Sequence, residues 1–257
     1  MRIVFIGSGN IAQFFGGRLH KKGHDIVQVY SRDLGHAQVL ATATNASVTD
    51  NLSEIVTDAD VYILAIKDGA LKEIADRLHF PDKVVIHCAG AVGLEVLQPT
   101  SAHNAVIWSL YSVSKNSLPK SNSVPLVVES SSERAMEAAL SLANDISDKV
   151  LQTDFRQRQM LHLNAVFANN FTNHLLAIAQ KICEEHQLPF EILHPIIRQT
   201  LEQTANILPA ESQTGPAIRN DQETLEKHMR LLEPHPEWQK IYADISYSIQ
   251  QAQTVQP

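Results

Sequence analysis

A glycine-rich turn near the amino terminus constrains most strongly what this chain can fold into. The pattern G-S-G-N-I-A at residues 7–12 lies between an apolar run, 2–6, and a helical stretch, 10–22, that Gly23 ends. Glycines there allow a tight turn and let the backbone approach a pyrophosphate, which the helix N-terminus then faces. The pattern alone is weak, because two glycines also meet by chance in turns. Its position after a strand and before a helix favours a dinucleotide site.

Apolar runs that alternate with helical patterns extend this turn into an α/β domain. Helical patterns at 70–78 and 132–146 separate several of these runs. Parallel neighbouring strands need long right-handed crossovers, so the alternation predicts a doubly wound, mostly parallel Rossmann sheet with helices on both faces. The further strands are expected at 26–30, 61–66, 84–87, 105–108, 124–128 and 149–152.

The strand patterns stop after Asp154, which is a suitable helix N-cap. The stretch 160–183 is apolar and free of glycine and proline, which is consistent with a buried central helix. We therefore expect a dinucleotide-binding domain over residues 1–153 and an all-α domain for substrate binding and dimerisation over residues 154–257.

The end of the second predicted strand bears on the choice between NAD and NADP. An NAD-binding domain places an acidic residue there for the ribose 2′-hydroxyl, whereas this strand leads into Ser31 and Arg32. A hydroxyl and a guanidinium suit a 2′-phosphate. The alternative is that Arg32 is a solvated loop residue and that Asp33 binds the ribose. We favour NADP.

Composition argues against several other functions. A net charge of −7 leaves no basic surface for a nucleic-acid backbone. The chain has no apolar run of the ~18 residues that a membrane helix needs and no secretory signal, so a soluble, cytoplasmic protein is expected. Cys88 and Cys183 lack C-x-x-C partners and are expected to be reduced, and the histidine spacing predicts no metal site.

Candidate catalytic residues lie in the second half. His162, Asn169 and Asn173 are spaced by about two and three helical turns and would share one stripe of the long helix. They either hydrogen-bond to neighbouring helices or face a substrate, with His162 as proton donor and the asparagines orienting a carbonyl or imine. Thr214 and Arg219 lie in a loop that is either a simple surface turn or a cover for the site, with Arg219 binding a substrate carboxylate.

Several of these segments resemble a known superfamily. Residues 7–12, 30–32, 65–67 and 87–90 resemble the pyrroline-5-carboxylate reductase and deazaflavin-dependent NADP oxidoreductase superfamily. The resemblance implies that the segments after the fourth and fifth strands line the nicotinamide. Residues 162–171 and 214–221, with Thr224 and His228, resemble a branch of predicted NADP oxidoreductases that join a Rossmann domain to a helical C-terminal domain of unknown function. That branch implies a homodimer formed through the helical domain and a cleft between domains, and it supplies no known substrate.

We therefore expect an NADP(H)-dependent oxidoreductase that transfers hydride between the nicotinamide and a small carbonyl or imine. The alternative is a non-catalytic NADP-binding or sensor protein, since a Rossmann site by itself proves only binding. The expected cofactor-binding residues are Gly7, Ser8, Gly9, Asn10, Ile11, Ser31, Arg32, Ala65, Ile66, Lys67 and Ala89, and the expected catalytic residues are His162, Asn169, Asn173, Thr214 and Arg219.

Overall fold

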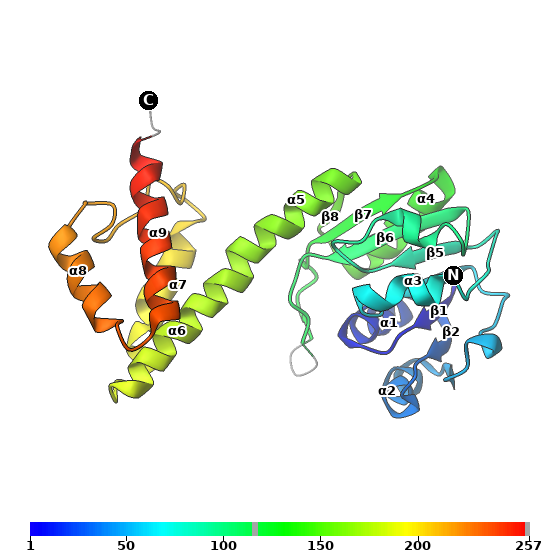
Figure 1. The fold of residues 1–257 in the computed structure, drawn as a ribbon. Helices are drawn as coiled ribbons and strands as arrows, with labels where there is room; N and C mark the ends of the chain where they lie inside the picture. Colours follow the sequence, from blue (N-terminus) through cyan, green and yellow to red (C-terminus); the bar gives the residue numbers. More distant parts are fainter. Residues whose placement is uncertain (115–117, 255–257) are drawn as a thin grey trace. The chain divides into compact units, whose positions relative to one another are not determined.

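The computed structural model describes residues 1–114 and 118–254. They form two compact units, Met1–Ala168 and Asn169–Pro257 (Figure 1). The sequence-based boundary after residue 153 follows the last strand, whereas the first unit also includes α5 (Phe155–Ala165). In the described part of the chain, no helix is long and apolar enough to cross a membrane.

The first unit is built on one eight-stranded sheet in the order β3-β2-β1-β4-β5-β6-β7-β8. Neighbouring strands pair in parallel, except that β6 and β7 are antiparallel. The order of the first six strands is that of a doubly wound Rossmann sheet, which confirms the predicted fold class. The strands are β1 (Arg2–Ile6), β2 (Asp25–Tyr30), β3 (Ser47–Thr49), β4 (Val61–Leu64), β5 (Val84–His87), β6 (His103–Ser109), β7 (Leu126–Ser130) and β8 (Val150–Gln152).

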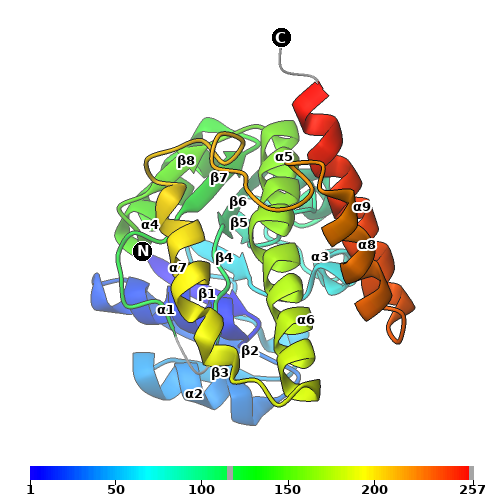
Figure 2. The ribbon, with the colours of Figure 1, turned by 90° about the vertical axis from the view of Figure 1, so that its left-hand side faces the viewer.

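Helices cover both faces of this sheet, as Figure 2 shows for α1 and α4 on one side and α3 on the other. Successive strand residues point to opposite faces, so Ile3 and Phe5 join one buried cluster while Val4 and Ile6 join the other. One face packs against α1 (Asn10–Lys21), α2 (Leu34–Thr44) and α4 (Glu133–Ile146), and the other against the 3₁₀ turns η1 (Leu52–Glu54) and η3 (Leu94–Leu97) and the short helix α3 (Leu71–Ala75), which follows η2 (Asp68–Ala70).

Polar caps begin two of the helices where the sequence predicts them. The Ser132 hydroxyl accepts a hydrogen bond from the backbone N–H of Ala135 at the start of α4. Asp154 and Gln157 form a reciprocal capping box at the start of α5. β3, which the sequence analysis missed, has three residues and too little pattern to be recognised.

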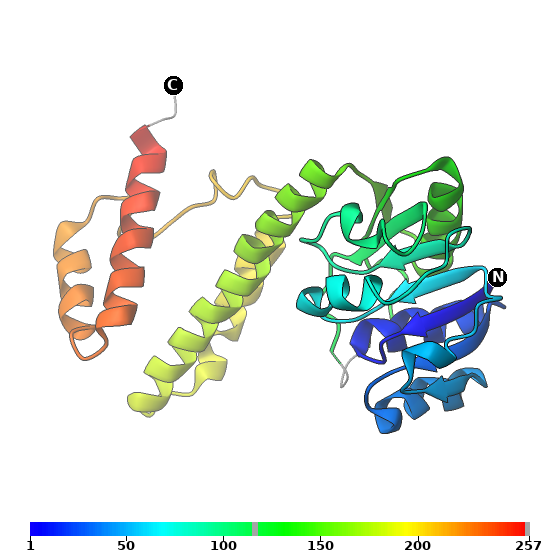
Figure 3. The ribbon, with the colours of Figure 1, turned by 45° about the vertical axis from the view of Figure 1, so that its right-hand side comes forward.

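The rest of the described chain is helical. A π-helical segment, η4 (Val166–Phe171), directly follows α5. Within the second unit, α8 and α9 lie side by side (Figures 1 and 3). The elements after η4 are α6 (Thr172–Glu185), η5 (Phe190–Leu193), α7 (His194–Gln203), α8 (Gln222–Leu231) and α9 (Pro236–Thr254).

Candidate functional site

The turn after β1 has the geometry of a phosphate-binding turn. Gly7 has a φ of +112°, and a Cβ there would lie 2.3 Å from the carbonyl oxygen of Ala65, so a side chain cannot be accommodated. Gly9 caps α1 without a side-chain hydrogen bond, and nothing lies within 4 Å of a Cβ built on it. Gly9 therefore leaves open space at the N-terminus of α1, where a pyrophosphate can bind.

The turn after β2 lies beside this phosphate turn. The Ser8 hydroxyl donates a hydrogen bond of 2.9 Å to the Ser31 hydroxyl, which joins the two turns. Arg32 is exposed and follows directly. Together Ser31 and Arg32 supply the hydroxyl and guanidinium that suit a 2′-phosphate at this place.

Asp33, the alternative ribose ligand, has a local role in the structure. Its Oδ1 accepts a hydrogen bond of 3.1 Å from the backbone N–H of His36 and so caps α2. Its Oδ2 lies 3.4 Å from Nδ1 of His36. Both carboxylate oxygens therefore have a partner in the first turn of α2, while Asp33 also lines the cavity described below.

A cavity of about 790 Å³ runs along the carboxyl ends of β1, β2, β4, β5 and β6. Ligands bind at this edge in open α/β sheets. Ten of the eleven predicted cofactor residues line it; in addition, the cavity wall includes Tyr30, Asp33, His36, Asp68, Ala70, Glu73, Ile74, Arg77, Cys88, Trp108, Ser109, Tyr111 and Val113. The exception is Ala89, which is buried and does not line the cavity.

Two buried polar atoms belong to residues of this cavity wall and have no hydrogen-bond partner among the described residues. They are Oδ1 of Asn10 and Oγ of Ser109. The amide nitrogen of Asn10 is in use, because it donates a 2.8 Å bond to the carbonyl of Val113. Buried polar atoms are normally paired, so unpaired atoms here fit a cavity that takes a polar ligand such as a dinucleotide.

His162 packs beside the wall of the cavity. Its ring lies 5.5 Å from the ring of Trp108, and a Cβ on Gly90 would lie 2.7 Å from its Cδ2. The nearby Cys88 thiol is held in its neutral form, since burial raises its pKa. His162 thus places an imidazole beside the cavity wall at Trp108.

The predicted stripe of His162, Asn169 and Asn173 is not that of a regular α-helix, and this expectation was wrong. The π-helical segment η4 lies between His162 and Asn173. A π-helix has about one more residue per turn than an α-helix. Residues before and after the π-helical segment therefore do not follow the α-helical spacing of 3.6 residues per turn. Asn169, Asn173, Thr214 and Arg219 all belong to the second unit. Thr214 and Arg219 are exposed.

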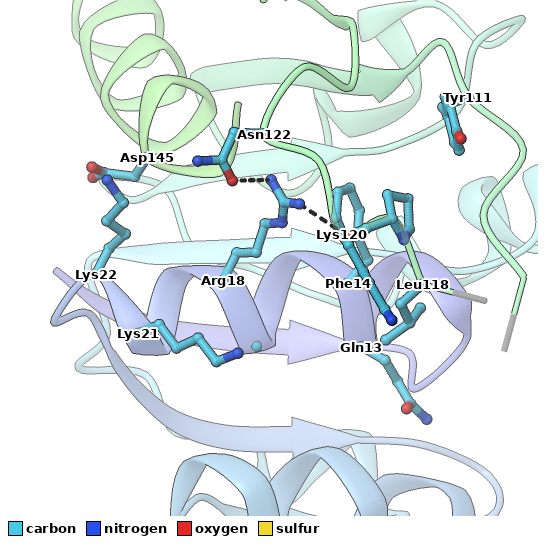
Figure 4. A pocket seen from close by; sticks show the side chains of 12 residues that line it. Gln13, Phe14, Arg18, Lys21, Lys22, Tyr111, Leu118, Lys120, Asn122 and Asp145 are labelled. Atoms are coloured by element: carbon cyan, nitrogen blue, oxygen red, sulfur yellow. Dashed lines mark hydrogen bonds between the residues drawn. The ribbon is translucent and has the colours of Figure 1, made fainter. Parts of the chain in front are cut away.

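A second and larger cavity, of about 1110 Å³, lies beside α1 and away from the strand ends (Figure 4). Arg18 lies at its centre and donates to the carbonyls of Pro119, Ser121 and Ile146 and to the side chain of Asn122. Its guanidinium therefore fastens the segment before β7 to the core. Because it lacks the phosphate turn and the strand ends, this cavity has no geometry for a dinucleotide.

The sequence analysis missed several residues of the site. Trp108 and Ser109 end β6, and they reach the cavity because β6 is parallel to β5. The rule that parallel strands end at one edge could have found them. Arg77 and His36 gave no such signal, since both lie on the cavity through the packing of loops and helices.

The fold and this cavity define a dinucleotide-binding protein of the Rossmann class. Two family models match the chain: "NADP oxidoreductase coenzyme F420-dependent" over residues 2–90 and "Domain of unknown function (DUF2520)" over residues 124–249. The solved structure of a candidate NADP oxidoreductase from Bacteroides fragilis is 34% identical, with a TM-score of 0.89 over 97% of this chain and 98% of that one. The chain therefore belongs to the NADP oxidoreductase family in which these two domains are joined.

Two further comparisons give a shared fold and a partial sequence match. Protein TM1727 from Thermotoga maritima shares the fold, with a TM-score of 0.81 and 23% identity over 97% of this chain and 98% of that one. A pyrroline-5-carboxylate reductase from Pseudomonas aeruginosa is 31% identical over 96 residues. That match spans 35% of this chain and 35% of the length of the reductase.

Proposed function

We propose that the protein is an NADPH-dependent reductase of a small imine or carbonyl compound, with cyclic imines as the first class to test. Bound NADPH would supply a hydride. The observation that carries the cofactor choice is the turn after β2, where the Ser31 hydroxyl and the Arg32 guanidinium line the cavity beside Asp33, which also caps α2.

Different residues of the cavity would then bind different parts of the cofactor. The glycine turn and the first amides of α1 bind the pyrophosphate, and Ser31 and Arg32 bind the 2′-phosphate. Ala65, Ile66, Lys67 and Cys88, together with Trp108 and Ser109, surround the nicotinamide end of the cavity. The apolar side chains among them, those of Ala65, Ile66 and Trp108, would exclude water from the reacting atoms.

The imine class is supported by the relative from Pseudomonas aeruginosa, whose name denotes a cyclic imine substrate. Reduction of an imine needs a proton for nitrogen in addition to a hydride for carbon. His162 would hold that proton, since its half-buried ring packs next to the cavity wall at Trp108. Asn169 and Asn173 would orient the substrate, and Thr214 and Arg219 would bind its polar or anionic end.

The experiment combines binding with turnover. Calorimetric titrations with NADPH and NADH test the choice of cofactor. The decrease in NADPH absorbance, followed with each member of a panel of cyclic imines, aldehydes, ketones and an oxidised deazaflavin, tests the reaction. We expect NADPH to bind more tightly than NADH and at least one imine to be reduced. NADPH binding without oxidation across the panel would favour the sensor function instead, and equal affinity for the two cofactors would contradict the proposed cofactor.

A further inference from the structure

Arg158, near the start of α5, is fully buried and donates four hydrogen bonds. Its Nε bonds to Oε2 of Glu129 at 2.9 Å. Its Nη1 bonds to the carbonyls of Ala89 and Gly90 at 2.9 and 2.8 Å, and its Nη2 bonds to the carbonyl of Val92 at 2.8 Å. Burial of a guanidinium carries a large desolvation penalty, which this one carboxylate and three carbonyls offset.

His87, the last residue of β5, holds the same segment by another polar group. Its Nδ1 accepts a hydrogen bond of 3.2 Å from the backbone N–H of Ala89. Burial, together with the charge of Arg158, lowers the pKa of His87 to about 3, so the ring is neutral near pH 7. Buried side chains thus hold one amide and three carbonyls of residues 89–92, and the shape of this segment is set within the protein.

The segment matters because Gly90 packs against two ring side chains. A Cβ on Gly90 would lie 2.6 Å from Cε2 of Trp108 and 2.7 Å from Cδ2 of His162. Trp108 lines the cavity at the strand ends. His162 follows Arg158 by one helical turn, on the same side of α5. Arg158 therefore ties together the segment after β5 and the helix that carries His162.

We propose that Arg158 is a positioning residue for the nicotinamide half of the cofactor, an inference that rests on the proposed function. By holding Gly90 against Trp108, its guanidinium shapes the wall where the nicotinamide and its ribose bind. The adenosine half lies at the end of a different strand, β2, at Ser31 and Arg32. A positioning role therefore predicts a loss of affinity that falls on one half of the cofactor.

Two ligands separate the halves: NADPH, and adenosine 2′,5′-bisphosphate, which lacks the nicotinamide half. Arg158→Lys keeps the charge but replaces the planar fork of donors by one ammonium, which cannot serve four acceptors. We expect this variant to bind NADPH at least about tenfold more weakly and the bisphosphate within about twofold, because small misplacements at such sites have large effects. Arg156→Lys, an exposed position on the same helix, is the matched control and should bind both ligands like the parent.

A spectroscopic measurement reports the nicotinamide directly. The chain has two tryptophans, Trp108 and Trp238, so in a Trp238→Phe background energy transfer from tryptophan to NADPH comes from Trp108 alone. We expect strong transfer in this parent and weaker transfer in Arg158→Lys at saturating NADPH. If Arg158→Lys does not fold, Glu129→Gln weakens the buried ion pair while keeping an acceptor for Nε, and the same two measurements apply to it.

Two results would overturn the positioning role and leave the proposed function standing. One is an equal loss of affinity for NADPH and for the bisphosphate. The other is unchanged affinity and energy transfer with a lower melting temperature, which is what a purely structural arginine would give. A parent protein that binds the bisphosphate but gives NADPH no additional affinity and no energy transfer would overturn the proposed function itself, and the inference with it.

Discussion

The hydroxyls of Ser8 and Ser31 lie 2.9 Å apart and join the phosphate turn after β1 to the turn after β2. In the proposed binding mode, Arg32 lies at the adenosine end of the cavity, and the ends of β4 to β6 form the nicotinamide end. Five predictions follow from the way in which these parts are arranged.

Arg32→Ala should weaken NADPH binding by about 10- to 100-fold and leave NADH binding almost unchanged, because a charge-assisted pair with a 2′-phosphate contributes about 1.5–3 kcal/mol. Calorimetric titration of both cofactors measures the ratio. Arg134→Ala, an exposed position on α4, is the control and should keep the preference for NADPH. An unchanged NADPH preference in Arg32→Ala would reject the phosphate role of this residue.

Gly7→Ala and Gly9→Ala should separate stability from binding. A Cβ on Gly7 would lie 2.3 Å from the Ala65 oxygen at a positive φ, so this variant should lose several kcal/mol of folding free energy, of the order of the largest single-substitution effects. A Cβ on Gly9 meets nothing within 4 Å of protein, but it lies where phosphate approaches the helix. Gly9→Ala should therefore melt like the parent and bind NADPH about tenfold more weakly or worse, since phosphate sites need close backbone approach. Thermal melts and titrations of both variants decide this.

His162→Gln tests the proton donor. Glutamine can form hydrogen bonds but cannot donate a proton near neutral pH, so turnover of an accepted substrate should fall by about 10²–10⁴ with NADPH affinity retained. A purely structural histidine would instead show a loss of about 1–3 kcal/mol in stability and little change in turnover. Turnover and melting temperature are measured on the same preparation. Retained turnover with reduced stability would rule out the catalytic role and give the sensor function more weight.

Acid should destabilise the fold through His87. Its folded pKa, about 3, is below the ordinary value of 6.5, so the unfolded chain binds a proton that the folded chain does not. The contribution of His87 to stability is therefore complete above pH 6.5 and is lost as the pH falls toward 3, by about 1.4 kcal/mol per pH unit. The free energy of unfolding, measured with urea at several pH values between 7 and 4, should fall less steeply with decreasing pH in His87→Leu than in the parent. His79 is exposed, and the control variant His79→Gln should show the same pH dependence of the free energy of unfolding as the parent. The same pH dependence in His87→Leu would contradict the role of His87 in acid destabilisation.

A homodimer formed through the helical unit remains our prediction for the assembly. Six large aliphatic side chains of that unit are each more than half exposed, and exposed apolar patches commonly mark protein interfaces. They are Leu188, Ile192, Ile196, Leu201, Leu208 and Leu231. Light scattering should give the mass of a dimer at micromolar concentration, and Ile192→Glu should lower it. Val39→Glu, an exposed apolar position on α2, is the control, and a monomeric parent would refute the prediction.

The sequence by itself determined the phosphate turn, the alternation of strands and helices apart from β3, and the start of the helical part at Asp154. These features depend on local signals, such as glycines at a fixed spacing, alternating apolar runs and a capping residue, which act within a few residues. Ten predicted cofactor residues lie on one cavity because the ends of parallel strands meet at one edge, and this rule can be applied without coordinates.

Other features were decided by the tertiary structure alone. Asp33 follows Arg32 in the sequence, and only the folded chain shows that it both caps α2 and lines the cavity. The π-helical segment η4 has no simple sequence signal and shifts the phase between His162 and Asn173. Arg158 reaches the carbonyl of Gly90, 68 residues earlier in the chain. A bond of this kind forms between a side chain and backbone carbonyls, which every residue has, so no pattern of residue types can reveal it before the chain is folded.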